Sequence, residues 1–382
     1  MGKNSRSNIK CVSIYYLRMN NQSKLLINLS LLLSKPTGIT VYAKNVFPYL
    51  KSLEPTLLSS QQYQDFNTYL VPNNLTPEQG TKGHLNRLLW TQFRLPKIYH
   101  TSSASLLFSP VPEAPLYSQC RSVVMVHDLI PLRFPKKISP LTPYFKYYIP
   151  QVLKQAEHII CNSQATAKDI VDIFNIPAQK ITPILLAYDD QHFRPLTIQK
   201  NAGTVPYFLY LGRHDPHKNV NRIIEAFANL KNNKNYQLWL AGPTDKRYTP
   251  KLIEQAQAFG IKQQLKILDY VEYEQLPIII NQALALVFPS LWEGFGFPVL
   301  EAMGCGTPII TSNISSLPEV AGDAGLLINP YNVEEITAAM ETIARDDKLR
   351  SQLKILGLQQ AKKFSWQTTG EKTLETLKQF LN

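Results

Sequence analysis

Two glutamates with a glycine-rich turn between them are the residues of this sequence best suited to bind a ligand. Glu293 and Glu301 flank the turn in the sequence EGFGFPVLE. The apolar run Ala283–Ser290 before it predicts a buried parallel strand, and PVLEAM after it predicts a helix with Pro298 in its first position. Glycines in such a turn allow close approach of a ligand, and free N–H groups at a helix start favour anions. The pattern indicates a site for a ligand with several hydroxyls and a phosphate.

Basic residues follow a second predicted strand, in the sequence YFLYLGRHDPHKN. Gly212 and Arg213 end this strand, and Lys218 and Asn219 precede the predicted helix VNRIIEAFANL. Arg and Lys side chains beside a helix start can stabilise negative charge on a ligand without a metal ion. A basic turn without any function is the alternative.

A histidine stands at the end of a third predicted strand. The continuous apolar run Val123–Val126 places His127 and Asp128 at its carboxyl end. Ligands of open parallel sheets gather at that edge. A lone histidine is nevertheless more often structural than functional. We expect Asp128 to orient the imidazole or to cap a loop.

All these residues depend on repeated units of strand, loop and helix. Such units occur on both sides of a polar segment without clear period, Arg194–Pro206, and predict two doubly wound α/β domains. The chain of 382 residues is long enough for two domains, and 44% hydrophobic and 18% charged residues are typical of a globular protein. LLINLSLLL, residues 25–33, is too short to span a membrane and predicts a buried first strand. A glycine turn at Gly38 and an amphipathic helix follow it.

The donor-side motif resembles that of a known family. EGFGFPVLE, continued by EAMGCGTPIITSNISSLPEVAGDAGLLINP up to Pro330, is similar to the donor-binding signature of the retaining GT-B glycosyltransferases of family four. The pattern G-R-x4-K-N at residues 212–219, the segment HDLIPLRFP at 127–135 and the turn at Gly38 also resemble this family. The resemblance implies two Rossmann-like domains that face each other across a cleft. A Rossmann dinucleotide site in GFGFPV is disfavoured, because the third glycine of that fingerprint is missing.

The resemblance also implies a domain organisation. We expect a loose N-terminal extension at residues 1–20, with Met19 as an alternative natural start. The acceptor-side domain would cover residues 21–196 and the nucleotide-sugar-binding domain residues 203–364. A C-terminal helix, residues 365–382, would cross back onto the first domain.

Each residue of the site receives a role from the resemblance. Glu301 would hold the ribose hydroxyls of the donor, and Glu293 the hydroxyls of its sugar. Arg213 and Lys218 would neutralise the diphosphate, and His127 would contact the donor sugar or its phosphate. The remaining donor-binding positions are Gly38 and Gly212, and the backbone N–H groups of Phe295, Gly296 and Phe297. No carboxylate nucleophile is obvious in the first domain, so we expect front-face substitution with retention rather than a covalent intermediate.

The net charge of +12 is carried entirely by the first half of the chain. Residues 1–200 hold 22 Lys and Arg against 10 Asp and Glu, whereas residues 201–382 hold 18 of each. No nucleic-acid recognition pattern accompanies this excess. An anionic membrane surface or a phosphate-bearing acceptor is therefore the expected partner, with a basic face that serves only solubility as the alternative.

One segment of the first half, residues 135–155, alternates lysines with aromatic residues. Aromatic rings suit the headgroup level of a membrane and lysines suit anionic lipid, so this segment is a candidate membrane-facing or acceptor-facing surface. An aromatic core face with a solvated lysine face explains the pattern equally well. The residues are Lys136, Lys137, Lys146 and Lys154 with Tyr144, Phe145, Tyr147 and Tyr148.

The cysteines and the N-terminus indicate a compartment. Cys11, Cys120, Cys161 and Cys305 are widely spaced and form no metal or disulfide pattern, which fits a reducing environment. The first twenty residues lack the apolar core and cleavage site of a secretory signal. We expect a cytoplasmic protein in peripheral contact with the cytoplasmic face of the membrane.

The function that these observations favour is sugar transfer in polysaccharide biosynthesis. We expect a retaining hexosyltransferase that moves a mannose-, rhamnose- or glucose-type sugar from a nucleotide sugar to a hydroxyl of a glycan or lipid-linked acceptor. No D-x-D metal motif is present, since Asp189 and Asp190 are adjacent, so no metal cofactor is expected. RLLW, SPVPEAPL and HDLIPLRFP resemble mannosyl- and rhamnosyltransferases, which favours GDP-mannose or a related GDP- or UDP-sugar. The alternatives are a sugar-nucleotide hydrolase, an epimerase, a sucrose-type synthase and a non-catalytic nucleotide-sugar-binding scaffold.

Overall fold

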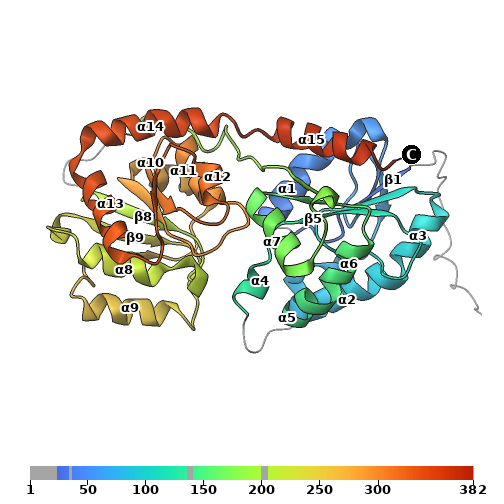
Figure 1. The fold of residues 1–382 in the computed structure, drawn as a ribbon, viewed down its shortest axis with the longest axis horizontal. Helices are drawn as coiled ribbons and strands as arrows, with labels where there is room; N and C mark the ends of the chain where they lie inside the picture. The colour runs from blue at the N-terminus through green and yellow to red at the C-terminus, as the bar shows by residue number, and fades with distance from the viewer. Residues whose placement is uncertain (1–23, 34–36, 136–140, 199–204, 382) are drawn as a thin grey trace, which may run out of the picture.

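The chain folds into two α/β domains that lie side by side (Figure 1). The proposed N-terminal extension, Cys11, Lys136 and Lys137 lie outside the part of the chain that the structure describes. This computed structural model describes residues 24–33, 37–135, 141–198 and 205–381.

Each domain is built on one sheet whose described strands are all parallel. The strand order is β3-β2-β1-β4-β5-β6-β7 in the first domain and β10-β9-β8-β11-β12-β13 in the second. In both sheets the order reverses beside the first strand, which places a crevice at the carboxyl ends of the central strands. Two doubly wound domains are therefore confirmed. The strands are β1 (Leu25–Asn28), β2 (Thr56–Ser59), β3 (Asn67–Leu70), β4 (Leu106–Ser109), β5 (Ser122–Val126), β6 (His158–Cys161), β7 (Ile181–Pro183), β8 (Tyr207–Leu211), β9 (Gln237–Ala241), β10 (Leu265–Leu268), β11 (Ala285–Phe288), β12 (Ile309–Ser312) and β13 (Leu326–Ile328).

Helices connect the strands of both sheets. None of the described helices is both long and apolar enough to cross a membrane. Among the shorter turns, η1 (Phe47–Leu53) and η6 (Pro216–Lys218) are 3-10 helices and η4 (Tyr144–Tyr148) is a π-helix. The α-helices are α1 (Gly38–Val46), α2 (Gly80–Phe93), α3 (Leu95–Thr101), α4 (Ile130–Arg133), α5 (Leu141–Pro143), α6 (Ile149–Gln155), α7 (Gln164–Phe174), α8 (Val220–Ala228), α9 (Thr249–Ala258), α10 (Leu276–Gln282), α11 (Phe297–Gly304), α12 (Leu317–Ala321), α13 (Val333–Arg345), α14 (Asp347–Ala361) and α15 (Trp366–Lys378).

The central strands are the continuous apolar runs of the sequence. Every residue of β1, β5 and β11 is buried, as expected for parallel strands covered on both faces. The expectation of a buried first strand in LLINLSLLL is thus confirmed. Strand β3 was not expected from the sequence, because this edge strand is mostly exposed and its residues Asn67–Leu70 lie in a polar stretch.

The C-terminal helix α15 packs on the first domain, although α14 before it lies over the second (Figure 1). The Ser365 side chain caps α15 by accepting a hydrogen bond of 3.1 Å from the N–H of Thr368. Gly370 lies so close to Tyr49 of η1 that a β-carbon there would approach the ring to 2.3 Å. The chain therefore crosses between the domains twice, once after β7 and once before α15.

The aromatic residues of segment 135–155 are for the most part packed inward. Tyr144, Phe145 and Tyr148 are half-buried against the core of the first domain, whereas the Tyr147 side chain is 60% exposed. The Lys146 ammonium is exposed and lies 5.5 Å from the centre of the Tyr147 ring. The interpretation of an aromatic core face with a solvated lysine face is thus the better description of most of this segment.

Candidate active site

The turn at residues 293–296, called the donor-side turn below, connects β11 to α11 in the second domain. Gly296 adopts φ = 128°, which favours glycine, and α11 begins at Phe297, so that Pro298 occupies the second position rather than the expected first. Gly294 has a different reason to be glycine. A β-carbon on it would lie 2.0 Å from the carbonyl oxygen of His127 in the first domain. Gly294 therefore permits close approach of the two domains.

Lys218 and Glu293 form an ion pair at the carboxyl ends of β8 and β11. The Lys218 Nζ lies 2.7 Å from Oε1 and 2.9 Å from Oε2 of Glu293. Asn219 holds the Lys218 turn in place: it adopts φ = 63°, and its side-chain amide donates to the carbonyl oxygens of Pro289 and Pro330 at 3.0 and 2.7 Å. Both charged side chains are mostly buried. The two motifs that the sequence analysis singled out separately are thus brought together.

Two serines that the sequence analysis did not select hold the backbone of Glu293. The hydroxyl of Ser315 accepts from the N–H of Glu293 at 2.9 Å and donates to its carbonyl oxygen at 2.6 Å. Ser316 donates to the same carbonyl at 3.1 Å and to that of Phe295 at 2.6 Å. Their signal was the SNISS segment of the family motif, which carries short hydroxyl side chains after a predicted strand.

Arg213 lies apart from the Lys218–Glu293 pair. Its side chain is 65% exposed, and its Nε is 3.2 Å from Asp215 Oδ2. The preceding residue, Gly212, adopts φ = 149°, and a β-carbon on it would lie 2.9 Å from the Tyr210 hydroxyl. This hydroxyl donates to the Arg213 carbonyl at 2.6 Å. Arg213 is therefore largely exposed to solvent, whereas Lys218 is fixed.

A cavity of about 810 Å³ lies where the domains and the C-terminal helix meet. It includes Gly38, Phe297 and Glu301 of the predicted site, but not His127, Arg213, Lys218 or Glu293. Its other walls come from α1, from the linker Tyr188–Asp190 and from the start of α15, which sequence reasoning did not anticipate. The lining residues are Thr37, Gly38, Val41, Asn45, Tyr49, Tyr188, Asp189, Asp190, Phe193, Tyr273, Leu276, Phe297, Glu301, Phe364, Ser365, Trp366 and Gln367.

Glu301 is a carboxyl group without a partner among the described residues. Burial raises its pKa to about 7, and no hydrogen bond or ion pair within that part of the chain offsets this effect. The N–H groups of Phe295, Gly296 and Phe297 likewise donate to no described residue. Unpaired polar groups inside a protein are uncommon, and beside a cavity they are candidates for contacts with a ligand.

His127 is a neutral side chain held by its own domain. Burial lowers its pKa to about 4, and its Nε2 donates to the carbonyl oxygen of Pro110 at 2.9 Å. The ring makes a T-shaped contact with Tyr42 at a centroid distance of 5.1 Å. Asp128 caps the following turn, since its Oδ1 accepts from the N–H of Ile130 at 3.0 Å, and it does not orient the imidazole. Of the two expectations for Asp128, the loop cap is correct.

The two-domain arrangement is that of solved enzymes with the GT-B fold. HepE from Anabaena in complex with UDP and glucose superposes with a TM-score of 0.71, over 93% of this chain and 99% of that chain, at 17% identity. At this identity the likeness concerns the fold alone. The fold and the cleft thus define a GT-B protein, as predicted.

The sequence comparisons give the family. The model described as Glycosyltransferase Family 4 matches residues 37–192, and that described as Glycosyl transferases group 1 matches residues 196–359. The chain is 32% identical to O-antigen chain mannosyltransferase B of Escherichia coli, over 68% of this chain and 70% of that protein. It is 26% identical to O-antigen chain mannosyltransferase RfbU of Salmonella typhimurium, over 84% and 90%. The chain belongs to the family-four, group 1 glycosyltransferases and is a glycosyltransferase.

Proposed function

We propose that this protein transfers mannose from a nucleotide sugar, with GDP-mannose as the first candidate, to a hydroxyl of a glycan or lipid-linked acceptor in polysaccharide biosynthesis. The observation that carries the proposal is the unpartnered Glu301 carboxyl in the cavity, one helical turn from the donor-side turn. Relatives named as O-antigen mannosyltransferases favour mannose as the sugar.

Each group of the site would bind a different part of the donor. The ionised Glu301 carboxylate can accept hydrogen bonds from two ribose hydroxyls, and the Lys218 ammonium can neutralise the diphosphate as the glycosidic bond breaks. Arg213, which is exposed, would approach the diphosphate when the donor enters. Glu293 would bind hydroxyls of the sugar, with its orientation fixed by Lys218 and the two serines. These roles need no metal ion, because lysine and arginine provide the positive charge.

Retention at the anomeric carbon would follow from front-face substitution. In that reaction the departing diphosphate accepts the proton of the acceptor hydroxyl, and the new bond forms on the face that the leaving group vacates. His127, neutral and bound to Pro110, lies on the opposite domain and would contact the donor sugar with its ring edge. Trapping of a covalent sugar adduct on a carboxylate would contradict this route.

The experiment that tests the proposal is turnover across GDP-, UDP-, ADP- and dTDP-sugars, with nucleotide release and product analysis by NMR. We expect release of GDP from GDP-mannose only when a mannan-type oligosaccharide is present, an α-linked product, and unchanged rates in EDTA. Equal release without acceptor would favour a hydrolase, and transfer to fructose or glucose phosphate a sucrose-type synthase. A folded protein that binds nucleotide sugars without turnover would be a scaffold, and loss of rate in EDTA would contradict metal independence.

The acceptor side of the first domain has a surface suited to an anionic membrane. Residues 79–156 contain ten Lys and Arg but only two acidic residues, Glu113 and Asp128, neither of which is exposed. Of the basic residues, Arg87 is buried against Glu113 and Arg133 pairs with Asp169, so the other basic residues that the structure describes carry the surface charge. On α2, Leu85, Leu89 and Phe93 recur every four residues and are 57%, 48% and 66% exposed. This apolar stripe borders a groove of about 500 Å³ whose walls include Leu88, Tyr117 and Tyr147. We propose that this surface contacts the cytoplasmic face of the membrane, where lipid-linked acceptors are found.

Vesicle flotation tests the membrane proposal. Vesicles with phosphatidylglycerol should retain the protein at low salt and release it as salt rises, whereas pure phosphatidylcholine should retain little. The triple variant Leu85→Ser, Leu89→Ser and Phe93→Ser should weaken binding about tenfold or more. The control Ile355→Ser removes a side chain that is 58% exposed on the second domain and should bind like the unchanged protein. Equal binding of the triple variant would contradict the proposal.

A further inference from the structure

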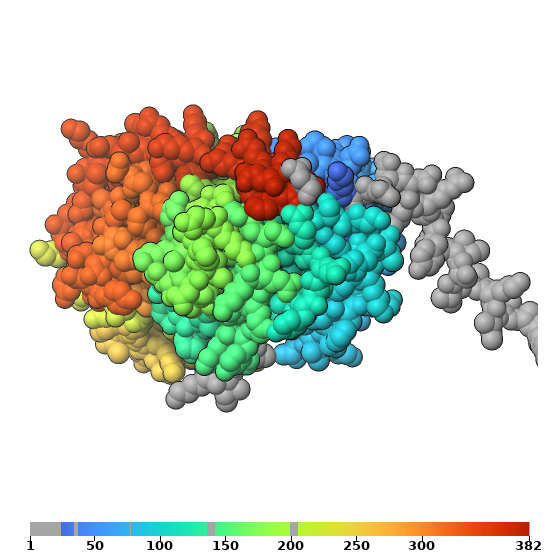
Figure 2. All heavy atoms as spheres, turned by 45° about the vertical axis from the view of Figure 1, so that its right-hand side comes forward, coloured from blue at the N-terminus to red at the C-terminus, as the bar shows by residue number. Residues whose placement is uncertain are grey.

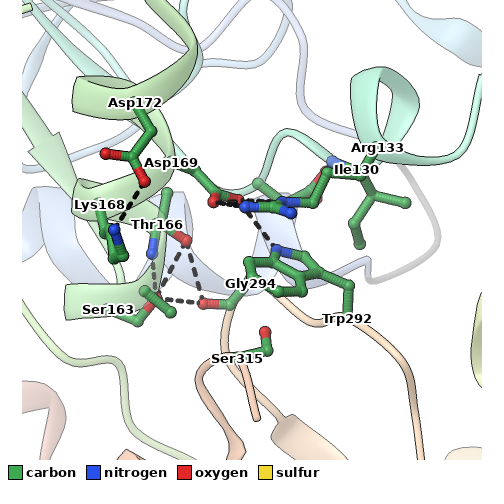
Figure 3. Close-up of polar contacts among 12 residues, drawn as sticks. Ile130, Arg133, Ser163, Thr166, Lys168, Asp169, Asp172, Trp292, Gly294 and Ser315 are labelled. Carbon is green, nitrogen blue, oxygen red and sulfur yellow. Dashed lines mark hydrogen bonds and ion pairs between the residues drawn. The ribbon is translucent and has the colours of Figure 1, made fainter. Parts of the chain in front are cut away.

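The second domain docks on the N-terminal half of one first-domain helix, α7 (Figure 3). Glu319 of α12 accepts hydrogen bonds of 2.8 Å from each of the first two N–H groups of α7, those of Gln164 and Ala165. These N–H groups have no partner within a helix, and a carboxylate is favoured at this positive end. The space-filling view shows first-domain atoms meeting second-domain atoms directly on this side (Figure 2). The two domains therefore share a specific, hydrogen-bonded interface at the start of α7.

One turn further along α7, Asp169 binds a tryptophan of the other domain. The indole Nε1 of Trp292 donates to Asp169 Oδ2 at 2.9 Å. Arg133 pairs with the same carboxylate through Nε, at 3.0 and 3.2 Å, and its guanidinium carbon lies 3.5 Å from the centre of the Trp292 ring. The indole is thus held by a hydrogen bond at its edge and a cation over its face.

The first domain also contacts Gly294, two residues after Trp292. The hydroxyls of Ser163 and Thr166, in the first turn of α7, donate to the carbonyl oxygen of Gly294 at 2.7 and 3.3 Å (Figure 3). The first domain therefore holds Trp292 and Gly294, which are the two neighbours of Glu293. Glu293 itself is held by Lys218 and the serines of its own domain.

Separation of the domains would remove the indole without leaving a buried charge alone. Asp169 and Arg133 belong to the same domain, so their ion pair persists when Trp292 leaves. Breaking a buried ion pair is costly, whereas exposing an indole N–H to water is not. The contact can therefore form and break as the cleft closes and opens.

We propose that Asp169 and Trp292 are positioning residues that link closure of the cleft to the placement of Glu293. In the closed cleft Asp169 fixes Trp292, and the hydroxyls on α7 fix Gly294, so the segment between them has one conformation. In an open cleft only the contacts to the second domain hold Glu293. The inference rests on the proposed function, because it assigns Glu293 to the donor sugar.

The test is Trp292→Phe, which keeps an aromatic ring under Arg133 but removes the indole N–H. Loss of one hydrogen bond from the closed form should raise the ratio of open to closed molecules about fivefold. Small-angle X-ray scattering of the ligand-free protein should then give a larger radius of gyration. With GDP-mannose, KM for the donor should rise by up to about fivefold, the full factor being reached where the open form predominates, while kcat at saturation changes less than about twofold, because donor binding restores the closed form.

Trp239→Phe is a matched control within the second domain. Its indole also donates one hydrogen bond, to Gln237 at 2.8 Å, and also lies under a cation, with Lys266 Nζ at 4.0 Å. We expect it to change neither the radius of gyration nor the donor KM. Asp169→Asn in the Trp292→Phe background should add less than about twofold to KM, because both residues act through one contact.

The outcomes separate this inference from the proposed function. If Trp292→Phe and Trp239→Phe give the same scattering and the same donor KM, the positioning role is overturned while sugar transfer stands. A fall of kcat with unchanged KM and scattering also overturns it, since the residue would then act in the closed complex alone. If no nucleotide sugar is turned over by the unchanged protein, the proposed function fails, and the scattering still decides whether Trp292 holds the domains together.

Discussion

Glu113 and Glu293 are both buried and both pair with a basic residue, and their surroundings differ in a way that separates structure from function. Glu113 in the first domain is 1% exposed and accepts from Arg87 Nε at 2.7 Å, from an Arg87 terminal nitrogen at 2.8 Å and from the Tyr144 hydroxyl at 2.8 Å. Glu293 in the second domain receives side-chain donors only from Lys218 among the described residues. The first carboxylate is saturated, and the second keeps acceptor capacity for a ligand.

The difference extends to the cations and to the third glutamate. Arg87 also donates to the Leu75 carbonyl and contacts His84, so each of its guanidinium nitrogens has a partner, whereas the Lys218 ammonium has donor capacity left. Glu301 lies at the extreme of this series, with no described partner at all. Pairing alone does not identify a functional charge. Unused hydrogen-bonding positions instead separate Lys218, Glu293 and Glu301 from the Arg87–Glu113 pair.

The largest effect is expected where the pair is saturated. Arg87→Met leaves the buried Glu113 charge unpaired and should lower the free energy of unfolding by about 3–5 kcal/mol, measured by urea denaturation at neutral pH. Adding Glu113→Gln should recover much of this loss, because the lone charge is then removed. Burial raises the pKa of Glu113, but the charge and hydrogen bonds of Arg87 outweigh burial and hold this pKa below its usual value of 4.5. The stabilisation by the pair is therefore present at neutral pH and is lost as the solution is acidified. Equal instability of the single and double variants would contradict this account.

At the proposed donor site the effect should appear in turnover instead. Lys218→Ala should lower kcat about 100- to 1000-fold, as for other groups that stabilise charge developing in the transition state. Lys168→Ala removes an exposed lysine paired with Asp172 and should leave kcat unchanged. If a folded Lys218 variant kept the normal turnover rate, the Lys218–Glu293 pair would have a structural role only, like the Arg87–Glu113 pair.

Glu301 should sharpen the comparison through pH. Because burial raises its pKa to about 7 and the ionised form accepts ribose hydroxyls, kcat/KM should rise about tenfold from pH 6 to pH 8. The folded protein keeps a proton that an unfolded glutamate releases near pH 4.5, so Glu301 lowers stability as pH rises toward 7. Glu301→Gln should thus flatten the pH profile and raise Tm more at pH 8 than at pH 5. An unaltered profile would show that another group titrates.

The smallest effect is expected for Arg213. Its side chain is 65% exposed, so solvent screens its charge, and we expect Arg213→Ala to lower kcat/KM only about tenfold. The loss should shrink further at high salt, in contrast to that of Lys218. A salt-independent loss as large as for Lys218 would mean that Arg213 becomes buried when the donor binds.

The sequence predicted the fold class and the separate motifs because both depend on local patterns. Apolar runs predicted strands such as β5 and β11, and the glycine turn with its following helix predicted the donor-side loop. Since parallel strands end at one edge of a sheet, motifs after different strands were expected to meet there. The edge strand β3, with no apolar run, was missed for the same reason.

Which motif residues touch, and which remain free, was decided by the tertiary structure alone. The Lys218–Glu293 pair joins residues 75 positions apart, and Trp292 and Asp169 are separated by 123 positions and belong to different domains. From the sequence, Gly294 could serve either a left-handed turn or a close contact between backbones. Only the packing of the domains shows that Gly294 is needed for close contact with the backbone of His127. The sequence fixes which groups each loop presents, because turns and strands form from neighbouring residues. Their final partners depend on how the two domains close.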